Sequence, residues 1–339
     1  MEQDEILNIQ DLRAYFYTQE GIVRAVDGAS FSVRRSKVLG VVGESGCGKS
    51  VTAQSVLRII PPPGRIVTGT IGYRRQLSEE DVSSASEVID LAELDPRGKE
   101  IRGIRGGEIA MVFQEPMTSL DTVYTIGDHL LEAITLHQSV DRREARQRAI
   151  QMLGSVGMPQ PSRTVDAYPH QLSGGMRQRA MIAIALSCHP SLLIADEPTT
   201  ALDVTTEAQI LDLMRDLQQQ MGTAIMYITH DLGVIAEMSD DVIVMYLGKV
   251  VEQADVDTLF YDPKHPYTRA LLHSIPKITS KARQRLQPIK GIVPDPYAIP
   301  NGCPFWPRCD EFMPGTCDRE VPAYLPVGPD HAVRCHLYS

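Results

Sequence analysis

A glycine-rich segment between an apolar run and a helix-like run decides much about the fold that this chain can adopt. Residues 43–50 read GESGCGKS, which fits the pattern G-x-x-x-x-G-K-S/T, and they follow the apolar run Val38–Val42. Glycines let the backbone curl so that successive N–H groups face one anion, and the following helix presents its positive end to that anion. The full match in this context predicts a phosphate-binding loop between a strand and a helix of an α/β fold.

The chemistry of this loop gives roles to two of its side chains. Lys49 supplies a point charge for the β- and γ-phosphates of a nucleotide, and the Ser50 hydroxyl is a ligand for Mg²⁺. Cys47 occupies a position that the pattern leaves free. The predicted nucleotide-binding residues of the segment are Gly43, Ser45, Gly46, Cys47, Gly48, Lys49, Ser50 and Val51.

Polar residues at the ends of further apolar runs complete the predicted site. The run LLIA ends in Asp196, which can hold Mg²⁺ together with Ser50, and in Glu197, which can polarise the attacking water as a general base. Gln114 follows another apolar run and is a candidate ligand of Mg²⁺ or of the attacking water. His230 follows a third apolar run and is a candidate contact to the γ-phosphate. Taken singly, such residues are more often solvated strand-end or surface groups, but their order along the chain favours the functional interpretation.

The segment LSGGMRQR lies at residues 172–179, between the phosphate loop and the acidic strand end. Ser173, Gly174 and Gly175 open a run with helical character, which makes a second helix N-terminus suited to an anion. A simple turn is the alternative interpretation of the two glycines. The order of the motifs favours the binding role.

With these motifs in place, the chain resembles the ATP-binding subunit of an ABC transporter, specifically of the oligopeptide/dipeptide importer family. The subfamily resemblance rests on QEPMTSL at residues 114–120, LSGGMRQRAMIAIAL at 172–186, HPYTRALL at 265–272 and the cysteine-bearing tail after Gly302.

The resemblance implies an α/β ABC ATPase cassette. Such a cassette has a RecA-like doubly wound core, an antiparallel β subdomain and a helical subdomain, followed here by a loop-rich extension. We expect the cassette at residues 1–265, its helical subdomain at about 115–175, and the oligopeptide-importer-type extension with four cysteines at 266–339.

The resemblance also implies a function and partners. The implied function is that of an ATPase that powers the import of dipeptides and oligopeptides, with nickel or oligosaccharides as alternative cargo. The expected partners are a second ATPase subunit, with a heterodimer favoured, two integral-membrane permease subunits docked near the segment after Gln114, and an extracytoplasmic substrate-binding protein. ABC ATPases that act on DNA or ribosomes are the alternative class, but they require a long coiled-coil insertion, a basic surface or two cassettes, which this sequence lacks.

In this family, two cassettes bind ATP between them, head to tail. Ser173, Gly174 and Gly175 would therefore act on the partner's nucleotide, and Asp203 would form the loop that links the two ATP sites. Phe16 is the expected aromatic platform for adenine, with its neighbours Tyr15 and Tyr17 as alternatives.

Composition limits the remaining classes of function. The formal net charge of -10 argues against a surface that binds nucleic acid. No apolar run approaches the roughly 20 residues of a membrane-spanning helix, and the acidic start does not fit a signal peptide. We expect a peripheral protein on the cytoplasmic face of the cell membrane.

Hydrophobic periodicity predicts the elements between the motifs. Apolar spacing is helical from about residue 126 to 158, as a helical subdomain requires. Strands at 192–195, 224–229 and 242–246 alternate with a helix at 207–219, which indicates a doubly wound core. Residues 78–105 are polar and charge-rich, as in an exposed insertion.

Four of the six cysteines lie in the tail: Cys303, Cys309, Cys317 and Cys335. A cytosolic compartment disfavours a lasting disulfide, and zinc would be favoured by closely paired C-x-x-C units, which are absent. Four thiolates on a loop-like segment suit an iron–sulfur cluster, and the family resemblance favours a 4Fe–4S cluster with a structural role. Zinc and unligated cysteines remain the alternatives.

Overall fold

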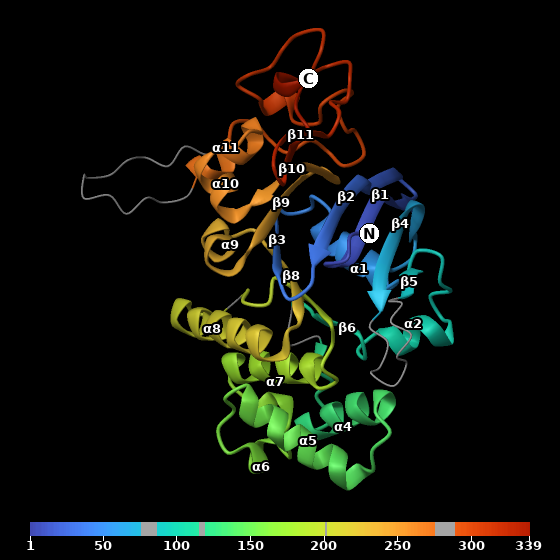
Figure 1. Ribbon diagram of the computed structural model, residues 1–339, viewed down its shortest axis with the longest axis vertical. Coiled ribbons are helices and arrows are strands. Elements are labelled where there is room, and N and C mark those ends of the chain that lie inside the picture. Colours follow the sequence, from blue (N-terminus) through green and yellow to red (C-terminus); the bar gives the residue numbers. More distant parts are fainter. Residues whose placement is uncertain (76–86, 115–118, 201, 275–288) are drawn as a thin grey trace, which may run out of the picture. The chain divides into compact units, whose positions relative to one another are not determined.

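The computed structural model describes residues 1–75, 87–114, 119–200, 202–274 and 289–339 (Figure 1). The chain forms two compact units. The first consists of Met1–Leu7, Val33–Val38 and Tyr73–Tyr227, and the second of Asn8–Ser32, Leu39–Gly72 and Ile228–Ser339. Because the second unit runs from 228 to the last residue, the predicted boundary at 265/266 does not separate the two units. A separate domain beginning there stays a prediction.

The first unit combines parallel strands with a group of helices. Its elements are β5 (Glu87–Asp90), α2 (Lys99–Ile104), β6 (Ile109–Val112), α4 (Ile126–His137), α5 (Arg142–Ser155), α6 (Pro161–Thr164), the 3-10 helix η1 (Pro169–Gln171), α7 (Gly174–Leu186), β7 (Leu192–Asp196), α8 (Val204–Met221) and the beginning of β8 (Ala224–Thr229). β7 lies between β8 and β6 and pairs in parallel with β6, with Val112 opposite Ala195. β7 and β8 are buried along their whole length, which is typical of parallel strands covered on both faces.

Local capping signals explain where the helices of this unit begin. Thr125 and Asp128 form a reciprocal capping box at the start of α4, and Asp141 caps α5 by accepting a hydrogen bond from the N–H group of Glu144. α4, α5 and α7 pack against one another (Figure 1). The predicted helical spacing between residues 126 and 158 is therefore confirmed. Of the predicted insertion at 78–105, residues 76–86 lie outside the described part of the chain, and the rest carries β5 and α2.

The second unit holds two sheets and the C-terminal residues. Its elements are most of β1 (Glu5–Thr18), β2 (Gly21–Arg34), β3 (Val38–Val42) and β4 (Gly64–Arg75), with α1 (Lys49–Val56), α9 (Leu232–Met238), β9 (Asp241–Tyr246), β10 (Lys249–Asp255), α10 (Val256–Tyr261), α11 (Pro266–His273), η2 (Trp306–Arg308), β11 (Leu325–Gly328), β12 (His331–Val333) and η3 (His336–Tyr338). One sheet has the order β2-β1-β4, and the other has the order β11-β12-β10-β9-β3.

The second of these sheets changes from parallel to antiparallel along its width. β3 and β9 are parallel, whereas β9, β10, β12 and β11 pair antiparallel in that order. The extension therefore contributes two strands to a sheet, which its loop-rich sequence did not indicate. Both strands are short and β11 contains Pro326, so neither has a readable alternation of polar and apolar residues.

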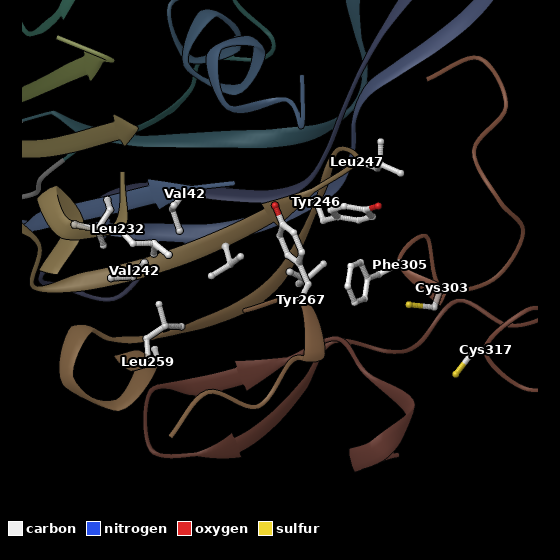
Figure 2. Close-up of a cluster of buried hydrophobic side chains, with 14 residues drawn as sticks. Val42, Leu232, Val242, Tyr246, Leu247, Leu259, Tyr267, Cys303, Phe305 and Cys317 are labelled. Atoms are coloured by element: carbon white, nitrogen blue, oxygen red, sulfur yellow. The ribbon is translucent and has the colours of Figure 1, made fainter. Parts of the chain in front are cut away.

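A buried cluster joins the sheet to the extension within this unit. Val42, Val244 and Tyr246 from β3 and β9 share it with Tyr267 of α11 and Phe305 of the extension (Figure 2). The rings of Tyr246, Tyr267 and Phe305 pack against one another, with centroids 4.7–5.3 Å apart. No helix among the described residues is long and apolar enough to cross a membrane.

Candidate functional site

The glycine-rich loop of the second unit joins the buried strand β3 to helix α1, as the sequence predicts. A Cβ atom on Gly43 would lie 2.2 Å from the carbonyl oxygen of Met245, and one on Gly48, whose φ is +102°, would lie 2.1 Å from that of Ala25. A Cβ atom on Gly46 would meet nothing within 4 Å, although its φ is +77°. Two glycines thus permit close packing of backbone, and the third serves only the turn.

Lys49 folds back onto its own loop. Its ammonium group donates hydrogen bonds to the carbonyl oxygens of Gly43, at 2.7 Å, and of Glu44, at 3.2 Å, and the side chain is buried. Ser50 follows it in the first turn of α1. The Cys47 side chain is buried beneath the loop, and burial raises the pKa of its thiol. The Lys49 ammonium group is therefore held by carbonyl oxygens of its own loop.

A half-buried ion pair supports the loop next to the β9–β10 turn. The N–H group of Gly248 donates a hydrogen bond to the carbonyl oxygen of Cys47. Next to Gly248, Lys249 forms an ion pair with Asp27 at 2.8 Å. The Asp27 carboxylate also accepts a hydrogen bond from the Tyr15 hydroxyl at 2.7 Å. Burial tends to raise the pKa of Asp27, but hydrogen bonds from Lys249 and Tyr15 outweigh it and hold this pKa below its usual range. Burial and Asp27 raise the pKa of Tyr15 to about 12.

The three aromatic candidates for the adenine platform have different surroundings. Phe16 packs against the backbone of Gly64, where an added Cβ would lie 2.6 Å from the ring. Tyr15 is engaged by Asp27, and Tyr17 lies under the guanidinium of Arg65, 4.4 Å from its ring centroid. Phe16 is the candidate whose ring makes no polar contact, so it stays the preferred prediction.

In the first unit, Glu197 directly follows β7 and has a left-handed backbone, with φ of +46°. Its carboxylate accepts hydrogen bonds from the Gln114 amide, at 2.8 Å, and from the Thr200 hydroxyl, at 3.1 Å. Asp196, the last residue of β7, is buried. An uncommon backbone conformation for a non-glycine residue often marks a functional position. The structure thus brings together Gln114 and Glu197, two of the predicted catalytic residues.

The LSGGM segment forms the beginning of α7. The Ser173 side chain caps the helix by accepting from the N–H group of Met176 at 3.3 Å, and Gly174 and Gly175 form its first turn. A Cβ on Gly175 would approach Thr206 to 2.7 Å. Asp203 caps α8 through Thr206, and these hydrogen bonds lower the pKa of Asp203. Asp203 is exposed, so helix capping leaves it free to contact a partner as well.

The remaining nucleotide-site residues are distributed between the units. His230 is exposed and follows β8 in the second unit, where the neighbouring Asp231 caps α9. The phosphate loop and Phe16 also belong to the second unit, whereas Gln114, Asp196, Glu197, the LSGGM segment and Asp203 belong to the first. Residues 115–118, which belong to the predicted docking segment, lie outside the described residues.

The four tail cysteines line one small cavity, together with His265, Trp306 and Met313. Burial raises the pKa of Cys303 to about 12 and that of Cys309 to about 11. The Trp306 indole N–H is buried, and no partner accepts its hydrogen bond among the described residues. Within that part of the chain, no group of three or more histidine, cysteine or acidic side chains is assembled as a metal site. Four thiols are the donor set that an iron–sulfur cluster takes, but no metal-ligand arrangement is assembled among the described residues, so the cluster stays a prediction.

Arg308 of the extension forms an ion pair with Glu44 of the phosphate loop, which the sequence did not predict. Two parallel hydrogen bonds of 2.7 and 3.0 Å join them, and the pairing raises the pKa of Arg308 above its ordinary value. The two residues are 264 positions apart, and no local pattern marks either one.

An apolar groove of about 340 Å³ lies in the first unit. β6, α4 and α7 supply its walls, and Phe113 and Leu136 expose 42% and 72% of their surface there. Ser119 and Leu120, which come soon after Gln114, line the same groove. Exposed apolar side chains gathered in a groove are typical of an interaction site.

Sequence comparisons show that this chain is similar to ATP-binding proteins of ABC transporters. The ABC transporter family matches residues 26–200, and the family described as oligopeptide/dipeptide transporter, C-terminal region, matches residues 251–317. The oligopeptide transport ATP-binding protein AppD of Bacillus subtilis is 47% identical, over 98% of this chain and 97% of that protein. The dipeptide transport ATP-binding protein DppD of Escherichia coli is 44% identical, over 98% of this chain and 96% of that protein.

The fold also matches solved structures. One is a dimeric ATP-binding cassette, MJ0796, in a post-hydrolysis state bound to ADP and Pi. It superposes with a TM-score of 0.62 at 24% identity, over 74% of this chain and 98% of that chain. At this identity the likeness shows the fold alone.

Proposed function

Because the chain belongs to the ABC transporter family, we propose that it is the ATP-hydrolysing subunit of an importer for dipeptides and oligopeptides. The observation that carries the ATPase activity is Glu197, held by Gln114 directly after a buried strand that ends in Asp196. The cargo class rests on the C-terminal match and on relatives that are named for peptide transport over nearly their whole length.

Each residue of the proposed site has a distinct task. Lys49 and the loop N–H groups would bind the phosphates, and Ser50, Asp196 and Gln114 are the residues that would hold Mg²⁺ and its water. Glu197 takes a proton from the attacking water, and His230 contacts the γ-phosphate. Mg²⁺ neutralises the charge that develops on the phosphates when it is bound.

Two substitutions separate chemistry from binding. Glu197→Gln keeps an amide in place of the carboxylate, so it should bind ATP and abolish hydrolysis, whereas Lys49→Ala should lose ATP binding. Asp216→Asn, more than three turns along α8 from Asp203, removes one exposed carboxylate and serves as a control. Phosphate release and titration with a fluorescent ATP analogue measure the two properties in the assembled transporter. Near-normal turnover by Glu197→Gln would rule out this assignment.

The proposed partners are a second ATPase subunit, two permease subunits and an extracytoplasmic binding protein, with this chain peripheral on the cytoplasmic face of the membrane. We place the permease contact in the apolar groove lined by Phe113 and Leu136, which a short permease helix can fill. Leu136→Asp should weaken co-purification with the permease and leave ATP binding intact. Val204→Asp, at an 83% exposed position of α8 outside the groove, is the control.

The cargo is tested in the complete transporter. Binding protein loaded with a peptide should stimulate ATP hydrolysis, whereas nickel or an oligosaccharide should not. Stimulation by nickel or by an oligosaccharide alone would replace the proposed cargo and leave the ATPase assignment unchanged.

We also propose that the four tail cysteines hold a 4Fe–4S cluster. What supports this is that all four line one cavity, whose wall contains the unpaired indole N–H of Trp306. Such a cluster would cross-link four positions of the loop-rich extension, so its role would be structural. Zinc is the alternative occupant.

Trp306 gives a direct test of the occupant. Protein purified without oxygen should be brown, contain iron and sulfide, and show weak tryptophan emission that rises when the cluster is removed. Cys317→Ser should raise the emission in the same way. Colourless protein that carries zinc or no metal, with unchanged emission after chelation, would refute the cluster.

A further inference from the structure

The strongest unassigned feature of the molecule is the contact between the C-terminal extension and the phosphate loop. Arg308 and Glu44 form a bidentate pair in which the arginine side chain is only 4% exposed and the glutamate 26%. Charge-assisted, two-point hydrogen bonds fix both the position and the orientation of their partners. Glu44 is the second residue of the loop and lies between Gly43 and the anion-facing turn.

Further hydrogen bonds hold both Glu44 and Arg308 in place. The backbone N–H group of Glu44 donates to the Tyr267 hydroxyl at 2.9 Å, so that α11 holds the main chain while the extension holds the side chain. Arg308 also donates from Nη1 to the Tyr246 hydroxyl at 3.3 Å and from Nε to the Lys290 carbonyl at 3.0 Å. Both tyrosines belong to the buried cluster of Figure 2.

The conformation of the extension sets the position of Arg308. Arg308 ends the short helix η2, directly before Cys309 and three residues after Phe305. Phe305 is buried against Tyr246 and Tyr267 (Figure 2). A disturbance of the cysteine-bearing segment therefore moves Arg308, and with it the anchor of the loop.

We propose that Arg308 is a positioning residue for the nucleotide: through Glu44 it holds the phosphate loop in its binding conformation, so that ATP affinity depends on an intact extension. This inference rests on the proposed ATP-binding role of the loop. The alternative is that the pair only attaches the extension to the sheet.

Variants on both sides of the pair separate these possibilities. Arg308→Gln and Glu44→Gln should each weaken ATP binding about tenfold and raise KM, with kcat within about twofold, because ground-state positioning is lost and Glu197 is untouched. The double variant should be no weaker than the weaker single variant, because both changes remove the same interaction. Arg308→Lys should recover only part of the affinity. The ammonium group restores the positive charge but cannot reproduce the two-point contact.

A second ion pair of the extension provides the matched control. Arg269 of α11 forms a bidentate pair with Glu311, at 2.7 and 3.2 Å, and this pair makes no contact with the loop. Arg269→Gln should therefore remove an ion pair of the extension, leave the Arg308–Glu44 pair in place and keep wild-type ATP affinity. Hydrogen exchange of a peptide covering residues 43–50 should accelerate in Arg308→Gln and stay unchanged in Arg269→Gln.

The outcomes distinguish this inference from the proposed function. Wild-type affinity in both Arg308→Gln and Glu44→Gln, or an equal loss in Arg269→Gln, overturns the positioning role. If Arg308→Gln does not fold, Glu44→Gln still decides, because it changes only the loop side. Retention of ATP binding by Lys49→Ala would instead overturn the ATP site itself.

Discussion

At the scale of single residues, the phosphate loop is held by contacts that few other side chains could replace. Gly48 passes against the backbone of Ala25, and Cys47 accepts a hydrogen bond from the β9–β10 turn. The Asp27–Lys249 ion pair stabilises that turn, because Lys249 directly follows it in the chain. The loop is therefore shaped by its neighbours as well as by its own glycines.

Gly46 and Gly48, two loop glycines in the left-handed region, should respond differently to alanine. Gly46→Ala places its methyl group in open space, so it should cost only the left-handed strain of about 1–2 kcal/mol. Gly48→Ala adds the same strain and a clash with the Ala25 carbonyl, so it should lower the unfolding midpoint further and abolish nucleotide binding. Thermal unfolding and a fluorescent-nucleotide titration of both variants check this. Equal effects of the two substitutions would contradict the packing argument.

The Asp27–Lys249 pair predicts a dependence on pH. The folded-state pKa of Asp27 is lowered, so the pair contributes stability above the unfolded pKa of about 3.9 and loses it as the pH falls through the folded pKa. Asp27→Asn should cost about 1–3 kcal/mol at neutral pH, because Lys249 loses its carboxylate partner and keeps only the backbone carbonyl of residue 27. Urea unfolding at several pH values should show this deficit shrinking below about pH 4. A deficit that is constant down to the most acidic pH argues against it.

At the scale of elements, one buried carboxylate connects three parts of the second unit. Glu252 of β10 is fully buried and accepts hydrogen bonds from the N–H groups of Lys264 and His265, before α11, and from His331 of β12. The three bonds measure 2.6–2.9 Å. The Glu252 carboxylate therefore links the extension and the start of α11 to the same strand, β10.

Replacing this carboxylate by an amide tests that connection. Each oxygen of Glu252 accepts a backbone N–H, so Glu252→Gln must direct its own N–H₂ group at one of these donors. We expect a loss of about 1–3 kcal/mol in the free energy of unfolding. Denaturation followed by the emission of Trp306 measures it. Glu311→Gln, at a partly exposed ion pair, is the control and should cost about 0–1 kcal/mol.

At the scale of the whole molecule, the proposed shared ATP site needs a second cassette. The LSGGM segment begins α7 with a Ser173 cap, which is a helix N-terminus suited to an anion. A heterodimer with a related subunit stays the favoured arrangement.

A large side chain at the cap tests the shared site. Ser173→Arg should abolish hydrolysis in the assembled transporter, because the arginine fills the space for the partner's phosphate, yet it should leave ATP binding by the isolated chain intact. Ser173→Ala removes the cap without adding bulk and should cost about 1 kcal/mol of stability, which isolates the effect of capping. Phosphate release and nucleotide titration report the two properties. Loss of ATP binding in the isolated Ser173→Arg chain contradicts the shared-site arrangement.

The sequence by itself determined the local chemistry of this protein. The phosphate loop, the Asp196-Glu197 strand end and the Ser173 helix start are each encoded within about eight neighbouring residues, so pattern and capping rules identify them. The buried strands and the helices between residues 126 and 158 followed from hydrophobic periodicity for the same reason.

Only the tertiary structure decided which distant residues meet. The contact of Gln114 with Glu197, the pairing of β12 with β10, and the pairing of Arg308 with Glu44 join segments from 79 to 264 positions apart. A charged residue carries no local mark of its partner, because the pairing depends on how the chain brings the two segments together. That is why the connection between the extension and the phosphate loop could be found only in the folded protein.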